Sequence, residues 1–132
     1  MGSEMCIRDS TMTDYVVLLP GDESAWAALT DEQRGETFAR HEEFAKALEA
    51  RGHQVTGGAE LTPSSTGRSI RLTGDAAVVT EGPYAEAVEQ VSGFYLVTSE
   101  DLDDLVEVSK ILVDAQGGIE IRACIDHSES AE

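Results

Sequence analysis

The sequence reads TEGPYAE over residues 80–86 and QVSGFYLV over residues 90–97. Pro83 fixes its own φ and disfavours helical geometry at Gly82, so a tight turn is expected directly after a short apolar strand. The aromatic and β-branched residues that follow predict another strand. Together the two segments predict a rigid turn that holds Tyr84 and Glu86 in defined positions beside that strand.

The composition describes a single acidic domain. The chain has 132 residues, of which 41% are hydrophobic, enough for one core and too few for a second domain. Its 26 acidic and 9 basic residues give a net charge of -17, which argues against nucleic acid or an anionic membrane as a partner. No apolar run approaches the roughly 18 residues of a membrane-spanning helix. We therefore expect a cytoplasmic protein.

The first twelve residues have neither helical nor strand periodicity, and a second start-like residue, Met12, ends them. We interpret residues 1–12 as a non-native or disordered leader of the read-through or vector-derived kind. Without them, Cys124 is the only thiol, so no internal disulfide is expected. The domain is expected at residues 13–125, followed by a flexible acidic tail at 126–132.

The domain alternates between strand and helix patterns. A continuous apolar run at residues 15–19 predicts a strand that is central in a sheet. The capping-box spacing after Thr30 predicts a helix that runs to about Arg51, with Gly52 as its left-handed terminator. Further strands are expected at 54–61, 93–98 and 119–124.

Two further elements complete the plan. A hairpin is expected at residues 69–72 and 77–80, with Ile70 and Leu72 facing the core and Arg71 facing away from it. A second helix is expected after a Ser99 cap and before Gly117. Its expected buried face consists of Leu102, Leu105, Val106, Leu112 and Val113. The order predicts an α+β fold, βαββαβ with an inserted β-hairpin.

The turn and its neighbours resemble the YCII-related family in its DGPF-motif branch. The family's Asp-Gly-Pro-Phe-Ala-Glu motif is similar to residues 81–86, and its Glu-Gln-Leu-Gly-Gly-Phe-Tyr-Leu segment is similar to residues 89–96. Other similar segments are 21–23 with Trp26, 57–61, 101–104 and 119–122. The resemblance implies a ferredoxin-like domain that pairs through its sheet into a homodimeric α/β barrel. That fold hosts oxygenases, isomerases, decarboxylases and non-enzymatic ligand binders, so it names no reaction.

His41 is the main candidate for catalysis. Small relatives in the family are thought to use a His and Asp pair between helix and sheet, and the resemblance carries this role to His41. Its spacing from Phe38 and Ala45 places it on or beside the apolar face of the first helix. A histidine there is either a general acid or base or a hydrogen-bonded core residue. The region of the acidic partner contains Asp114 but lacks the relatives' proline.

The other candidates each have an ordinary structural alternative. Asp22 is a second catalytic candidate and Glu23 a ligand-binding one, because either can orient His41 or receive a proton, but both also suit a solvated turn. Tyr84 and Tyr95 are expected either to line a ligand pocket or to pack in the core and the dimer interface.

Arg71 lies close to Arg68 in an otherwise acidic chain. The two arginines form a positive spot that either binds an anionic ligand or pairs with Glu60, Glu81 or Glu86. Arg71 and Glu60 are therefore included among the candidate ligand-binding residues.

Several chemistries lack a sequence signal. The three histidines and Cys124 show no metal-ligand spacing, and no phosphate loop or dinucleotide motif is present, so neither a metal nor a cofactor is expected. Two classes of function remain. One is a small homodimeric enzyme or ligand-binding protein that acts on an unknown small molecule by acid–base chemistry at His41. The other, which the resemblance implies, is a non-catalytic accessory or regulatory module linked to extracytoplasmic-function sigma factors.

Overall fold

The computed structural model describes residues 12–114 and 117–127. Of the leader expected at 1–12 and the tail expected at 126–132, residues 1–11 and 128–132 lie outside the described residues.

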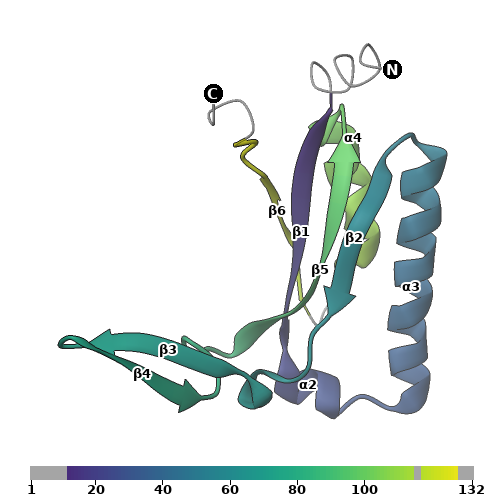
Figure 1. The fold of residues 1–132 in the computed structure, drawn as a ribbon. Helices are drawn as coiled ribbons and strands as arrows, with labels where there is room; N and C mark the ends of the chain where they lie inside the picture. Colours follow the sequence, from purple (N-terminus) through teal and green to yellow (C-terminus); the bar gives the residue numbers. More distant parts are fainter. Residues whose placement is uncertain (1–11, 115–116, 128–132) are drawn as a thin grey trace.

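Four strands form an antiparallel sheet in the order β2-β5-β1-β6 (Figure 1). They are β1 (Thr13–Asp22), β2 (Gln54–Glu60), β5 (Glu89–Ser99) and β6 (Glu120–Ala123). The strand expected at 15–19 is confirmed as a central one. Tyr15 pairs with Val97 and Val17 pairs with Tyr95, so these four side chains share one face of the sheet.

The long helix α3 (Asp31–Ala50) begins and ends where the sequence predicts. Thr30 and Gln33 form the reciprocal capping box at its start. Gly52, with φ of 88°, terminates it, and the N–H of His53 donates to the carbonyl of Leu48 at 3.0 Å. This is the Schellman arrangement, which directs the residue after the glycine back toward the helix. A short helix, α2 (Glu23–Ala27), precedes α3 and was not predicted.

The second predicted helix is shorter than expected. Helix α4 (Leu102–Ser109) is capped by the side chain of Asp101, not Ser99, and continues as the 3-10 helix η2 (Lys110–Leu112). Its buried face is Leu105, Val108 and Ser109. Leu102, Val106 and Val113 are exposed, contrary to the prediction. Only a narrow side of this short helix meets the rest of the core, so the flanking apolar positions face outward.

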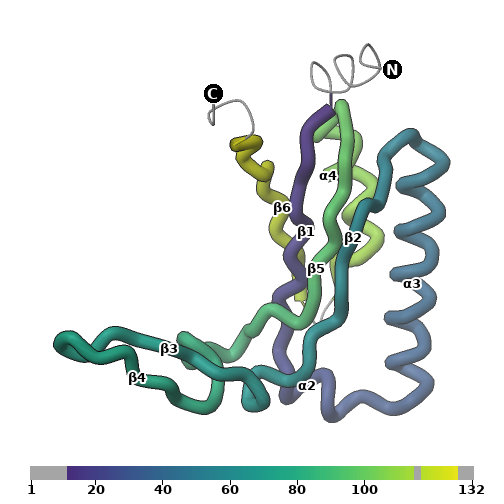
Figure 2. The backbone as a smooth tube through the Cα atoms, viewed as in Figure 1, coloured from purple at the N-terminus to yellow at the C-terminus, as the bar shows by residue number. Residues whose placement is uncertain are grey.

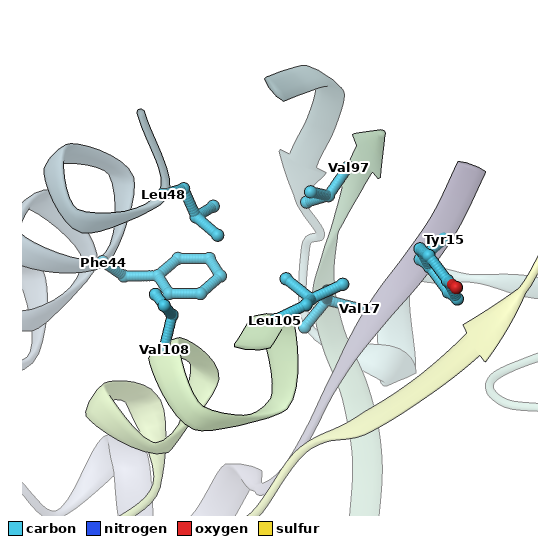
Figure 3. Close-up of a cluster of buried hydrophobic side chains, with 7 residues drawn as sticks. All are labelled: Tyr15, Val17, Phe44, Leu48, Val97, Leu105 and Val108. Carbon is cyan, nitrogen blue, oxygen red and sulfur yellow. The ribbon is translucent and has the colours of Figure 1, made fainter. Parts of the chain in front are cut away.

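The core lies between one face of the sheet and the two helices α3 and α4 (Figure 3). Its buried apolar side chains are Tyr15, Val17, Phe44, Leu48, Val97, Leu105 and Val108. Strands β1 and β5, helix α3 and helix α4 each contribute to it. The arrangement confirms the predicted ferredoxin-like α+β fold.

Within residues 12–114 and 117–127, no helix covers the opposite face of the sheet. Val16 pairs with Leu96 and Leu18 pairs with Phe94, so these four half-buried side chains lie on the face remote from the core. We call this set the helix-free face.

The hairpin projects from the body as an arm (Figures 1 and 2). It consists of β3 (Arg68–Thr73) and β4 (Ala76–Glu81), which form a separate two-stranded sheet, and we call residues 68–81 the arm. Ile70 and Leu72 were predicted to face the core, which is wrong: they are 60% and 74% exposed. Alternation along a strand predicts which residues share a face, but it does not predict that the face meets the body.

The residue before Pro83 takes the turn geometry expected of it. Gly82 has a φ of 107°, in the region that favours glycine, and its N–H donates to the carbonyl of Gly67 at 2.9 Å. The turn therefore closes the base of the arm and sends the chain back toward β5.

A polar cluster joins the end of α3 to the start of α4. His53 is 5% exposed and contacts Ser99 Oγ through Nδ1 at 2.7 Å and Asp104 Oδ2 through Nε2 at 2.8 Å. Arg51 donates to both oxygens of the same carboxylate. The hydrogen bond from His53, and after it the one from Arg51, lowers the pKa of Asp104. The cluster ties the start of β2 to helix α4.

We predict that Asp104→Asn lowers the melting temperature at pH 7 more than Asp103→Asn does. Asp103 is the control because it is the neighbouring acid in the first turn of α4. A folded-state pKa below the ordinary value gives stability that is fully present above about pH 4 and is lost as the pH falls through the folded pKa. The gap between wild type and Asp104→Asn should therefore narrow in acid. Thermal unfolding followed by circular dichroism checks this, and a gap of equal size at pH 7 and at about pH 3 contradicts it.

Candidate functional site

His41 lies on the inner side of α3, between the helix and the sheet. It is three residues before Phe44 and seven before Leu48, the two buried residues of the helix, so all three share one side. Its Nδ1 lies 2.7 Å from the hydroxyl of Tyr95 on β5. The ring of Tyr95 also packs against Phe44, with 5.2 Å between centroids. The helix–sheet interface thus changes from apolar to polar at His41.

Burial perturbs both partners of this pair. His41 is half-buried, and loss of hydration lowers its pKa, while Glu60 and Asp114 act in the opposite direction. Burial raises the pKa of Tyr95. At neutral pH His41 is therefore a neutral imidazole bonded to a protonated phenol.

Three charged residues accompany the pair. Glu60 ends β2, and Asp114 follows η2. Both carboxylates favour the protonated form of His41 electrostatically. Arg40, the residue before His41 on α3, contacts Asp114 Oδ2 at 3.1 Å. The arginine neutralises part of the acidic field and ties Asp114 to α3.

Gly58 explains why β2 passes so close to Tyr95. It pairs with Tyr95 across the sheet, and a Cβ on it would lie 2.5 Å from the carbonyl oxygen of Phe94 and 3.4 Å from the Tyr95 ring. Its φ of 147° is also unfavourable for any other residue. A glycine at this position lets the strand approach Tyr95 and places Glu60 two residues further along the same strand.

The geometry is suited to proton transfer at Nε2 of His41. Among the described residues, no hydrogen bond engages this nitrogen, whereas both nitrogens of His53 are engaged. When Nδ1–H donates to the oxygen of Tyr95, Nε2 carries a free lone pair and can accept a proton. Glu60 and Asp114 then stabilise the imidazolium that forms.

Asp22 and Glu23 have structural partners of their own. Asp22 accepts hydrogen bonds from the N–H groups of Ser24 and Ala25, at 2.9 and 3.2 Å, and so caps α2. Glu23 accepts from the N–H and the hydroxyl of Ser64, at 2.7 and 2.6 Å. The two contacts between Glu23 and Ser64 hold the loop after β2 against α2.

Tyr84 and Arg71 form a second location at the base of the arm. The Arg71 guanidinium stacks on the Tyr84 ring, 4.0 Å from its centroid, and donates to the Tyr84 carbonyl. A hollow of about 580 Å³ lies there, which we call the arm-base hollow. Its lining includes Leu61, Pro63, Arg68, Ile70, Tyr84 and Val91, but neither His41 nor Tyr95. Of the predicted site residues, His41 and Tyr95 therefore lie at one location and Tyr84 and Arg71 at another. Asp22 and Glu23 make their contacts at α2.

Two features were not predicted from the sequence. The sequence contains no signal for the contact between Arg40 and Asp114, since an arginine on a helix is ordinarily solvated. The burial of His53 does have a signal, because the residue after a helix-terminating glycine commonly packs back on the helix.

Within residues 12–114 and 117–127, no three His, Cys, Asp or Glu side chains come together as a metal site requires. The described helices also include none with the length and apolar character to cross a membrane.

Comparison with known proteins gives a family and one relative. The model of the YCII-related domain matches residues 13–127. The uncharacterized protein R00369 of Rhizobium meliloti (strain 1021) is similar to this chain, with 29% identity over 111 residues. The match covers 82% of this chain and 89% of that protein.

We predict that His41 makes the protein less stable in mild acid. Because its folded-state pKa lies below the ordinary 6.5, the unfolded chain takes up the proton first. The stability that the neutral form maintains is complete above pH 6.5 and is lost as the pH falls through the folded pKa. His41→Gln should reduce the fall in unfolding free energy between about pH 7 and pH 5, measured by urea denaturation. The exposed His127→Gln is the control, and equal slopes for the two variants contradict the prediction.

Proposed function

The chain belongs to the YCII-related domain family, and within it we propose a small-molecule-binding protein with acid–base chemistry at His41. The observation that carries the proposal is the 2.7 Å contact between His41 Nδ1 and the Tyr95 hydroxyl, at the point where the helix–sheet interface becomes polar. Half-burial of both groups supports a site that excludes bulk water in part.

In this proposal His41 is the base and Tyr95 positions it. The phenol oxygen accepts from Nδ1–H before and after proton transfer, so the ring keeps one orientation throughout. Nε2 takes a proton from the bound molecule and returns it later as a general acid. The lowered pKa of His41 keeps the base in its neutral, receptive form at neutral pH.

The charges near His41 support one class of ligand. Glu60 and Asp114 make the surroundings acidic, and Arg40 is engaged by Asp114. A neutral or cationic small molecule suits this field better than an anion, since an anion would meet two carboxylates. An anionic ligand, for which Arg71 was a candidate, is better supported at the arm base, where the guanidinium lies on Tyr84.

The finer family assignment is also a proposal. The similarity of Glu81-Gly82-Pro83-Tyr84-Ala85-Glu86 to the DGPF motif supports membership of that branch. In this interpretation the motif serves the fold, because Gly82 supplies the positive φ that closes the base of the arm.

We predict that a thermal-shift screen of neutral and cationic small molecules yields a ligand whose stabilisation requires His41 and Tyr95. At a concentration of 100 times its Kd, such a ligand stabilises the folded state by about 2.7 kcal/mol, which raises the melting temperature by several degrees. His41→Gln and Tyr95→Phe should abolish most of this rise.

Matched controls exist for both substitutions. Tyr84→Phe tests the arm-base hollow, and His127→Gln changes an exposed histidine. Both variants should respond as wild type does. A ligand that stabilises all variants equally contradicts the assignment to His41. A screen with no ligand at all favours the non-catalytic accessory role.

We further propose that the protein is a homodimer formed through the helix-free face. A sheet face of half-buried apolar side chains, Val16, Leu18, Phe94 and Leu96, is suited to packing against a second sheet. Each copy carries a charge of -17, so apolar contact has to overcome mutual repulsion.

Light scattering at physiological salt should give twice the 14.1 kDa mass of one chain. Leu18→Glu, which places a charge on the helix-free face, should shift the mass toward one chain while circular dichroism stays native. Glu120→Gln, at the residue paired with Leu18 on β6, removes a charge and should leave the dimer intact. A monomeric wild type would disprove the dimer.

A further inference from the structure

An ion pair lies directly beside the candidate base. Arg40 Nη1 contacts Asp114 Oδ2 at 3.1 Å, and Arg40 is the residue before His41 on α3. The side chain of Asp114 is 21% exposed and that of Arg40 43%, so the acid is the more buried partner. Water and salt screen partly buried charges less than exposed ones. This pair therefore acts on its surroundings more strongly than an ordinary surface pair does.

The backbone that carries Asp114 is fixed independently of Arg40. The N–H of Asp114 donates to the carbonyl of Gly117 at 3.2 Å, and the N–H of Gly117 donates back at 3.3 Å. Gly117 lies against β1, where a Cβ on it would be 2.7 Å from the carbonyl oxygen of Pro20. Removal of the arginine side chain therefore takes a cation away from Asp114 without releasing its backbone from β1.

His41 faces titratable or charged groups from several elements. The hydroxyl of Tyr95 contacts it from β5. Glu60 on β2 and Asp114 after η2 both favour its protonated form. Strand β1 contributes apolar side chains to this face of the sheet. Two acids and one phenol thus surround the imidazole, and Arg40 is the cation that the structure pairs with one of the acids.

We propose that Arg40 is a positioning residue for His41: its ion pair with Asp114 directs that carboxylate toward the guanidinium and so keeps the imidazole neutral and able to accept a proton. When the cation is lost, the full field of Asp114 acts on the ring and favours the imidazolium. An imidazolium has no lone pair with which to take a proton from a bound molecule. The inference rests on the proposed function for the role of His41 as a base, but the electrostatic link can be measured without a ligand.

The test is the titration of His41 in the full-length protein, followed by NMR of the imidazole protons between about pH 5 and about pH 9. The chain has three histidines, and His41→Gln identifies the signal of this one. Arg40→Gln should raise the midpoint of the titration by several tenths of a pH unit, because Asp114 loses the cation that balances it. Arg40→Lys keeps the charge and should stay closer to wild type. Circular dichroism checks that each variant is folded.

Arg34→Gln is the matched control for loss of a charge from α3. Arg34 lies seven residues before His41, on the same side of the helix, but donates to the carbonyl oxygens of Trp26 and Ala27 at 3.2 and 3.1 Å. This variant has the same net charge as Arg40→Gln. It should change the midpoint of His41 much less.

Asp114→Asn distinguishes indirect from direct action of the arginine. By itself this substitution should lower the midpoint of His41, because an acid that favours the imidazolium is removed. In its background, Arg40→Gln should change the midpoint much less than it does in the wild-type background. Should Arg40→Gln not fold, Asp114→Asn still decides, since a midpoint that does not fall overturns the link.

Three outcomes overturn the proposal. The first is a midpoint that Arg40→Gln leaves unchanged or lowers. The second is a rise that Arg34→Gln reproduces in full, and the third is a rise of equal size with and without Asp114, which shows direct action by the arginine. Failure of the proposed function is a separate result, because it consists of a ligand screen in which His41→Gln responds as wild type does.

Discussion

Burial of one face of the β1–β5 pair beneath α3 and α4 is the interaction on which the rest of the structure depends. Val17 and Val97 on the strands and Phe44, Leu48 and Leu105 on the helices are fully removed from water. Removal of apolar surface from water is the dominant favourable term in folding, so this layer determines how helices and sheet lie. It covers one face only. The arm and the helix-free face consequently remain outside the core of a single chain.

The middle and the carboxyl end of α3 show how histidine serves different purposes in one interface. At its carboxyl end, His53 has both nitrogens engaged, by Ser99 and Asp104, and is almost fully buried. A ring in that state satisfies polar groups and has no lone pair to offer. In the middle of the helix, His41 has one nitrogen engaged by Tyr95 and is half-exposed. Two histidines in one interface therefore differ in their surroundings: the candidate base is partly exposed and has a nitrogen without a hydrogen bond among the described residues, and the structural histidine has neither property.

Much of the fold could be predicted because it depends on local rules. The capping box at Thr30 and the terminator Gly52 gave the ends of α3, and the apolar run of residues 15–19 gave a central strand. The arm shows where such rules stop. Alternation in β3 indicates an apolar face correctly, but whether that face meets the body depends on the path of the chain through the Gly82 turn. Helix α4 shows the same limit, because Asp101 competes with Ser99 for the cap and Ser99 is taken up by His53.

The sequence by itself determined the order and type of the strands and of the helices α3 and α4, but not α2. It also determined the turn at Gly82-Pro83 and His41 as a polar residue on an otherwise apolar side of a helix. These follow from interactions between residues close together in the chain. Only the tertiary structure decided that Tyr95 meets His41, that Glu60 and Asp114 raise the pKa of His41 against the effect of burial, and that Tyr84 belongs to a separate hollow. His41 and Tyr95 are 54 residues apart and meet because α3 packs on β5. Such contacts arise from the burial of the sheet face as a whole, which no local pattern encodes.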